Sequence, residues 1–179
     1  MEQYIAFLRA VNVGGRVVKM DKLRDMFVSL GVKNVKTYIQ SGNVIFDAGG
    51  NISALRKKIE TLLQKELGYE IPTMIRTVAE VANIAENNPL KKVKLAEGAK
   101  TYVSFLSEEP AKEVVRSLLA LNNEDLTFHI SKSEVYSIIS KKASDKAPFS
   151  NAYLEKKIGM AATTRNLSIP GKIIQFLNK

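Results

Sequence analysis

The order of the predicted secondary structure elements constrains the fold of this chain more than any single motif does. Hydrophobic periodicity and turn residues in the first half predict, in order, a strand, a helix, two strands, a helix and a strand over residues 3–10, 22–30, 33–40, 44–47, 53–67 and 71–76. This is the order of the ferredoxin-like βαββαβ unit. The pattern therefore predicts an α+β fold rather than a parallel α/β sheet.

Local signals support the two helices of this unit. Asp21 is expected to cap the first helix, and Gly31 is expected to end it. The second helix has apolar residues at helical spacing, and Gly68 follows its last turn. Both helices can therefore bury one face against a sheet.

The second half of the chain repeats this order. A capping box at Thr77 and Glu80 predicts a short helix, and the lysine-rich connection 91–100 is the candidate boundary between domains 1–90 and 91–179. Beyond it we expect a strand, a helix, two strands and two helices over residues 101–107, 110–121, 127–131, 135–140, 150–158 and 173–177. The fold class is thus two tandem ferredoxin-like units with antiparallel sheets. In the second unit, a basic helical end replaces the fourth strand, and we expect symmetry of architecture without a repeat of residues.

Composition narrows the classes of function. The chain has 179 residues, 45% of them hydrophobic, which is enough to bury a core without disulfides or a structural metal. It contains no Cys, which excludes thiol nucleophiles, zinc–thiolate sites and iron–sulfur clusters. We predict no metal and no cofactor. Without a basic leader or a membrane-length apolar run, the chain is expected to be cytoplasmic and not membrane-bound.

The charge is strongly positive, with a net value of +9 and an isoelectric point near 9.6. From Lys132 to Lys179 the sequence has nine Lys or Arg residues against three acidic residues. Such a balance favours nucleic acids, phosphorylated metabolites and other anionic partners. The same lysines can also simply solvate helices and loops. The oligomeric state is not indicated.

Two glycine-bearing turns in the first unit contain more polar residues than a turn requires. In a ferredoxin-like sheet the end of the first strand lies beside the hairpin that joins the second and third strands. Two sets of residues should therefore meet along one rim: Arg9, Asn12, Gly14 and Gly15 with Gln40, Ser41, Gly42 and Asn43.

The chemistry of this rim suits an anionic or oxygen-rich ligand. Gly14 and Gly15 allow backbone amides to approach closely, and the helix that follows offers its positive end. Arg9, Arg16 and Lys19 add charge. The alternative is that these residues only form turns, because Gly, Asn and Ser are common turn residues.

Four motifs also stand in a fixed order along the chain: Arg9-Ala10-Val11-Asn12-Val13-Gly14-Gly15, Lys19-Met20, Thr37-Tyr38-Ile39-Gln40-Ser41-Gly42-Asn43-Val44-Ile45-Phe46 and Thr163-Thr164-Arg165-Asn166. Together they resemble a widespread, mostly bacterial family catalogued as domain of unknown function 1697. The resemblance covers nearly the whole chain. It implies two tandem ferredoxin-like units and no established activity.

The resemblance also implies that Arg165 and Asn166 contribute to the same site from the second half. The chain departs mildly from the usual RGINVGG string at Ala10 and Val11, and departs more from TxRNWNT over residues 167–169. Pro170-Gly171 is expected to interrupt a helix there.

Catalytic templates are missing from the sequence, which has no Walker loop, no G-x-S-x-G and no H-E-x-x-H. His129, the only histidine, lies in an apolar alternating strand without a partner motif, so no catalytic residue is predicted. RNA recognition is weakened by a third strand without paired aromatics. Three classes stay open: a binding module for an anionic ligand, a protein-interaction or structural module, and an enzyme that uses arginine for charge stabilisation.

Overall fold

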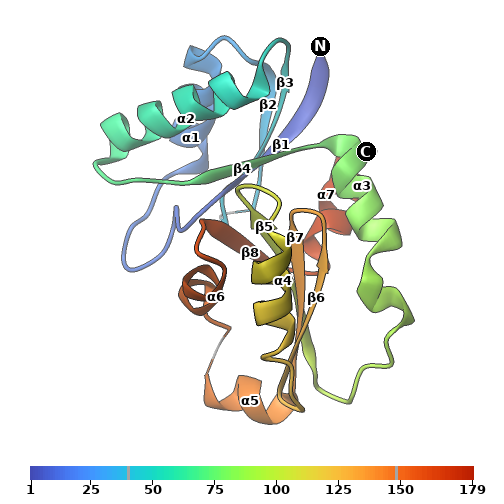
Figure 1. The fold of residues 1–179 in the computed structure, drawn as a ribbon. Coiled ribbons are helices and arrows are strands. Elements are labelled where there is room, and N and C mark those ends of the chain that lie inside the picture. The colour runs from blue at the N-terminus through green and yellow to red at the C-terminus, as the bar shows by residue number, and fades with distance from the viewer. Residues whose placement is uncertain (40, 148) are drawn as a thin grey trace. The chain divides into compact units, whose positions relative to one another are not determined.

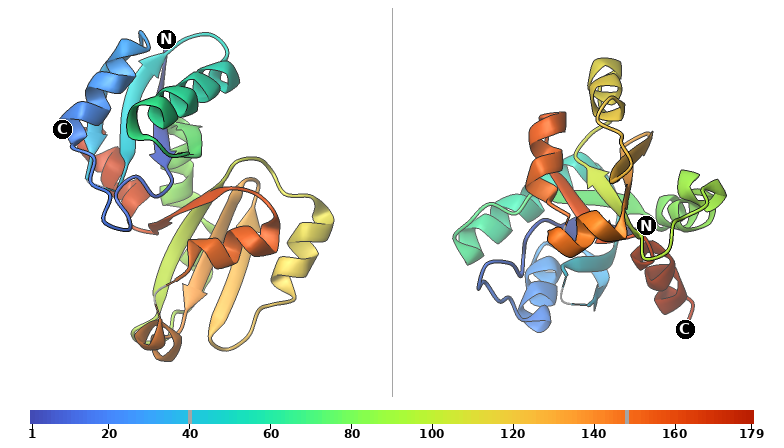
Figure 2. Two further views of the ribbon diagram at one scale, coloured as in Figure 1. Left: turned by 90° about the vertical axis from the view of Figure 1, so that its left-hand side faces the viewer. Right: turned by 90° about the horizontal axis from the view of Figure 1, so that it is seen from below.

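The computed structural model describes residues 1–39, 41–147 and 149–179. The chain divides into two compact units (Figures 1 and 2). Unit 1 comprises Met1–Ala82 and Ile173–Lys179, and unit 2 comprises Asn83–Lys172. Each unit is built around its own four-stranded sheet.

Unit 1 has the predicted ferredoxin-like order of elements. They are β1 (Glu2–Leu8), α1 (Met20–Ser29), β2 (Lys33–Tyr38), β3 (Asn43–Ala48), α2 (Ile52–Leu67) and β4 (Thr73–Thr77). The strands lie in the order β2-β3-β1-β4, and every neighbouring pair is antiparallel. This confirms the fold class for the first half of the chain.

The helices of unit 1 begin and end for different local reasons. Asn51 caps α2 by accepting a hydrogen bond from the Ala54 amide at 3.0 Å, and Gly68 ends the helix in the left-handed conformation. α1 instead begins after Lys19 without a side-chain cap. The expectation that Asp21 caps this helix is wrong, because Asp21 lies within its first turn and pairs with Arg24 at 3.2 Å.

The sheet of unit 1 buries both faces. One face packs its apolar side chains against α1 and α2, and the ring centroids of Phe27 and Phe46 lie 5.6 Å apart in this core. Ile5, Phe7 and Ile45 point to the other face and are fully buried. Burial of both faces explains why β1 and β3 read as nearly continuous apolar runs.

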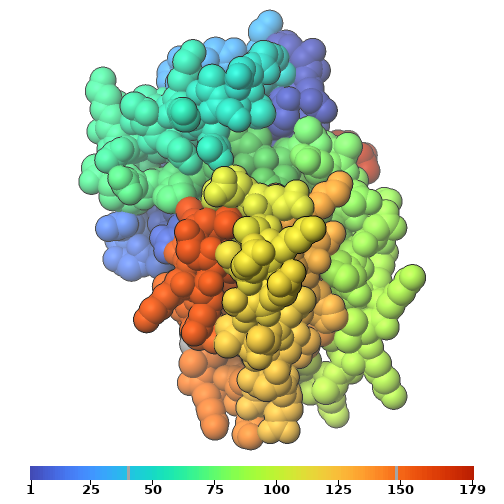
Figure 3. All heavy atoms as spheres, viewed as in Figure 1, coloured from blue at the N-terminus to red at the C-terminus, as the bar shows by residue number. Residues whose placement is uncertain are grey.

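Unit 2 contains β5 (Lys100–Leu106), α4 (Lys112–Leu119), β6 (Leu126–Ser131), β7 (Glu134–Ile139), α5 (Lys141–Lys146), α6 (Asn151–Ile158) and β8 (Ala162–Asn166). Its strands lie in the order β6-β7-β5-β8, which is the arrangement of unit 1. Figure 3 shows α2 (turquoise) and α4 (yellow) on the surfaces of their units. This confirms two tandem ferredoxin-like units.

Two expectations about the second half are wrong. The fourth strand is present as β8, which pairs with β5 from Tyr102↔Asn166 to Leu106↔Ala162, so no helix replaces it. Pro170 does not interrupt the last helix, because it lies in the first turn of α7 (Ile169–Leu177), where a proline costs no hydrogen bond.

Two further elements precede β5. They are α3 (Val78–Asn87) and a 3-10 helix, η1 (Pro89–Lys92). The predicted capping box is confirmed at the start of α3. The Glu80 amide donates to Thr77 Oγ1 at 3.1 Å, and the Thr77 amide donates to Glu80 Oε2 at 2.7 Å.

The units correspond residue by residue in their first strands, which we did not expect from the sequence. The run from Tyr4 to Leu8 in β1 matches the run from Tyr102 to Leu106 in β5. Ile5 pairs with Arg76 in unit 1, as Val103 pairs with Arg165 in unit 2. The symmetry therefore extends beyond architecture.

Within the described ranges, no helix is both long and apolar enough to span a bilayer.

Candidate functional site

Backbone contacts bring the end of β1 and the β2–β3 hairpin together. The Leu8 amide donates to the Gly42 carbonyl at 2.8 Å, and Phe7 lies opposite Asn43 in the sheet. A Cβ atom at Gly42 would lie 2.6 Å from Val11 Cγ1, and Gly42 has a φ of 79°. Only glycine fits this contact without a shift of its neighbours. We call residues 9–19 together with Ser41, Gly42 and Asn43 the rim.

The longer part of the rim is the loop between β1 and α1 (Figure 1, blue). Its base is held by two side chains. Asn12 Oδ1 accepts from the Val18 amide at 2.6 Å, and the Tyr69 hydroxyl donates to the Val11 carbonyl at 3.2 Å. The side chains of Val11 and Val18, whose backbone groups form these bonds, are buried. The loop is therefore anchored at both ends.

Gly14 and Gly15 form the exposed turn of this loop. Their φ values are 67° and 80°, and no atom lies within 4 Å of a Cβ built on either residue. Their need for glycine is therefore conformational, because L side chains rarely adopt positive φ. An open backbone in this conformation can present its amides to a ligand.

Two basic side chains follow the glycine pair along the loop. Arg16 is exposed, and its guanidinium carbon lies 3.9 Å from the centroid of the Tyr69 ring. Lys19 is exposed and directly precedes α1, whose first turn has no side-chain cap. The positive charge thus lies beside free backbone donors of a helix N-terminus. Asp21 offsets part of this charge but is paired with Arg24.

The hairpin part of the rim has a partly structural role. Asn43 is fully buried, and its Nδ2 atom donates to the Tyr38 carbonyl at 3.0 Å and to Ser41 Oγ at 2.9 Å. These bonds close the turn. Ser41 itself is exposed, whereas Gln40 lies outside the described residues.

Arg9 is half-buried at the end of β1, and its amide donates to the Pro72 carbonyl at 3.0 Å. The two segments of the rim meet at Leu8, Val11 and Gly42. Of the predicted site residues, Arg9, Asn12, Gly14, Gly15 and Lys19 lie on the loop, and Ser41 and Asn43 lie on the hairpin.

The two candidates from the second half lie in β8 of unit 2. Arg165 is 8% exposed, and its Nη1 atom donates to Thr163 Oγ1 at 2.8 Å and to the Thr164 carbonyl at 3.0 Å. Burial lowers the pKa of Arg165 to about 10, so it stays charged at neutral pH. Asn166 Oδ1 accepts from the amide and the hydroxyl of Ser168, at 3.1 and 2.9 Å. Asn166 thus organises the start of α7.

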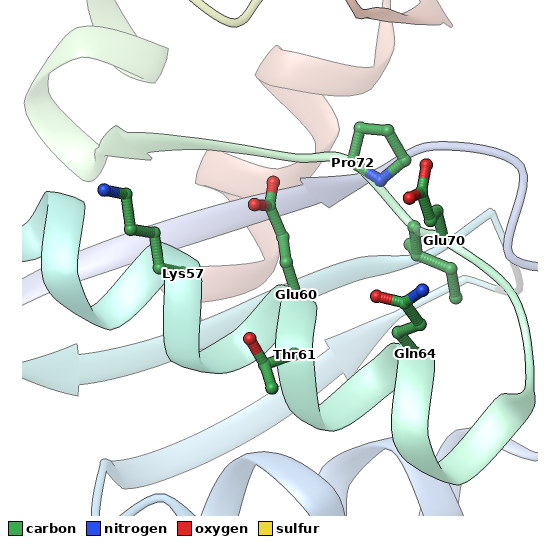
Figure 4. A pocket seen from close by; sticks show the side chains of 7 residues that line it. Lys57, Glu60, Thr61, Gln64, Glu70 and Pro72 are labelled. Carbon is green, nitrogen blue, oxygen red and sulfur yellow. The ribbon is translucent and has the colours of Figure 1, made fainter.

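A hollow of about 450 Å³ lies on α2 and the segment before β4 (Figure 4). Glu60 and Gln64 rise from α2 toward Glu70 and Pro72, while Glu60 Oε1 accepts from the Thr73 amide at 2.8 Å. None of the predicted site residues lines this hollow. We did not predict this hollow from the sequence. The spacing of Glu60 and Gln64, which places them on one face of α2, could have indicated it. Its carboxylates suit hydrogen-bond donors rather than anions.

The sheet of unit 1 does not offer a stacking platform for nucleic acid. Phe7 and Ile45, which occupy the face that such modules expose, are fully buried. Tyr4 faces the helices and stacks on Phe46 with ring centroids 6.0 Å apart. His129 is half-buried in β6 opposite Tyr136.

Comparison with known proteins shows both the family and the fold. The model of a family described as "Protein of unknown function (DUF1697)" matches residues 1–136. A solved structure described as that of conserved bacterial protein SP0830 from Streptococcus pneumoniae is similar, with a TM-score of 0.78 and 24% identity. The similarity covers 100% of this chain and 99% of that one. The search of curated proteins found no match.

Proposed function

Because the chain belongs to the DUF1697 family, whose description names no activity, we propose a function from the geometry of the rim. We propose that unit 1 binds an anionic ligand, which is a nucleotide, a phosphorylated metabolite or a nucleic acid backbone, at the loop between β1 and α1. Gly14 and Gly15 would donate backbone hydrogen bonds to the anion, and Arg16 and Lys19 would neutralise it.

The observation that carries this proposal is the exposed, positive-φ glycine pair, which is followed by Arg16 and Lys19 and then by a helix without a side-chain cap. The equivalent connection of unit 2, residues 107–111, closes the same kind of sheet without any glycine. A ferredoxin-like unit therefore does not require the glycine pair. A positive-φ glycine backbone that leads into a helix N-terminus four residues later is a feature found at anion sites.

The other rim residues would act by positioning. Asn12 holds the loop through the Val18 amide, and Asn43 closes the hairpin beside it. Arg9 and Ser41 would hold a second group of the ligand. The proposal assigns no contact to Arg165, whose guanidinium donates to Thr163 and Thr164 in its own strand.

One observation favours a second candidate function, the docking of a protein. Val13 and Val17 are 61% and 84% exposed on the same loop, which is unusual for two large apolar side chains so close together. The enzyme alternative has no comparable support, since we identify no acid–base group at the rim among the described residues.

A thermal-shift screen of the full chain tests the anion site. The probes are nucleoside triphosphates, sugar phosphates, pyrophosphate and short DNA and RNA oligonucleotides, each at low and high salt. A ligand at about 100 times its Kd adds roughly 2.7 kcal/mol to stability, or several degrees. We expect a shift that Arg16→Ala abolishes and that Lys33→Ala, an exposed lysine at the start of β2, leaves unchanged. Shifts that respond equally to both variants would mean unspecific attraction of polyanions, and no shift would move the assignment to protein docking.

A further inference from the structure

Unit 2 has an apolar hollow of about 250 Å³ at one end of its sheet. It lies where β6 begins and β7 ends, at the paired residues Leu126 and Ile139, and α5 and the start of α6 complete it. The rest of its apolar lining consists of Ala143, Ala147, Phe149 and Tyr153. No residue of the rim lines this hollow.

The polar side chains at this hollow are engaged in the fold. Ser150 Oγ accepts from the Tyr153 amide at 3.1 Å and caps α6. Ser140 Oγ accepts from the Ala143 amide at 3.1 Å and donates to Asp125 Oδ1 at 2.7 Å. A hollow with so few polar groups left to orient a small molecule suits an inserted apolar side chain better.

Most of the charged side chains beside the hollow are basic. Lys146 is exposed and directly precedes Ala147, and Lys157 Nζ lies 5.4 Å from the centroid of the Tyr153 ring. Lys142 Nζ lies 4.0 Å from Asp125 Oδ2, so this acidic residue is already partly neutralised. The Glu155 carboxylate accepts from the Ala162 amide at 2.9 Å. Asp145 on α5 is also exposed, but Lys141, Lys142 and Lys146 outnumber it there, so the net charge of α5 is positive.

We propose that this surface docks an acidic segment of a partner protein, which inserts one large apolar side chain into the hollow. Carboxylates that flank the inserted residue would pair with Lys146 and Lys157. Such an apolar anchor surrounded by complementary charge is the usual composition of a binding hot spot. The concave shape argues against a lipid surface, because proteins bind lipid surfaces with apolar side chains that protrude.

The test is an NMR titration of the ¹⁵N-labelled full chain with two synthetic peptides. One peptide has acidic residues around a central Leu-Phe pair, and its twin has Ala-Ala at the centre. We expect the Leu-Phe peptide to shift the amides of Ala143, Ala147 and Tyr153, and to bind about tenfold more tightly than its twin. Equal binding of the two peptides, or no binding, would overturn the proposal.

Variants test whether peptide binding depends on the residues of the hollow. Tyr153→Ala and Lys146→Glu should each weaken the Leu-Phe peptide severalfold. Lys112→Glu, the same charge change at an exposed position on α4, should not. An equal loss in Lys112→Glu would mean that only net charge matters and would overturn the proposal. Binding to anionic phospholipid vesicles that Tyr153→Ala abolishes would replace the protein partner with a membrane surface.

Discussion

The two units have the same sheet topology but differ at the edge where the first strand ends. In unit 1 the connection to the first helix runs from Arg9 to Lys19, whereas in unit 2 it runs only from Ser107 to Ala111. The unit 1 connection is basic and contains the glycine pair, while the unit 2 connection exposes Glu108 and Glu109. The features that both units have are those that the fold requires. We therefore look for a function in the additional residues of the unit 1 connection.

The hydrogen bonds at this edge show that the framework is the same in both units. The Leu8 amide donates to Gly42 in unit 1 at 2.8 Å, and the Leu106 amide donates to Ser133 in unit 2 at 2.9 Å. The next amide along, Arg9 or Ser107, donates to the segment before the fourth strand in each unit. The longer loop of unit 1 was therefore accommodated without a change in strand pairing.

Among the variants that test this comparison, Gly42→Ala is expected to lower the free energy of unfolding most. The new Cβ would lie 2.6 Å from Val11 Cγ1 at a φ of 79°, so backbone strain and overpacking should together cost about 2–4 kcal/mol of unfolding free energy. Gly31→Ala is the matched control, because its φ is 81° and the space around it is open. It should cost only about 1 kcal/mol. Equal losses in chemical denaturation would show that the contact with Val11 does not hold the rim together.

Asn43→Ala is expected to lower the free energy of unfolding by an intermediate amount. This change removes two hydrogen bonds and leaves the buried turn without its donor, which should cost about 1–3 kcal/mol. Asn87→Ala, which breaks a bond between exposed side chains on α3, should cost under about 0.5 kcal/mol. The readout is chemical denaturation of both variants. If Asn43→Ala instead abolishes anion binding at unchanged stability, Asn43 contacts the ligand and is not a positioning residue.

The sequence predicts the framework of both units well and the roles of single residues less well. Local periodicity and turn residues were sufficient for unit 1, and the handedness of its connections correctly brought Gly42 next to the end of β1. The fourth strand of unit 2 was missed because β8 is short and contains the polar residues Thr163, Thr164, Arg165 and Asn166. Its extended conformation is stabilised by pairing with β5, which no local pattern indicates.

The roles of single side chains in the rim could not be predicted from the sequence either. Asn12, Gly14 and Asn43 are all ordinary turn residues, so their types alone do not distinguish a buried bond from an exposed donor. Only the fold separates them, because Asn43 is fully buried whereas Gly14 is exposed.

The smallest loss of stability is expected from Glu108→Lys with Glu109→Lys, which makes the unit 2 connection basic like the unit 1 loop. Both residues are exposed, so the two changes should cost under about 1 kcal/mol, mostly through the lost interaction with the start of α4. We expect no new anion site in the thermal-shift screen, because this connection lacks the positive-φ glycine pair that presents amides in unit 1. If the double variant gains a salt-resistant shift that survives Arg16→Ala, lysine charge beside a helix start is sufficient. The glycine pair would then no longer explain why unit 1 binds.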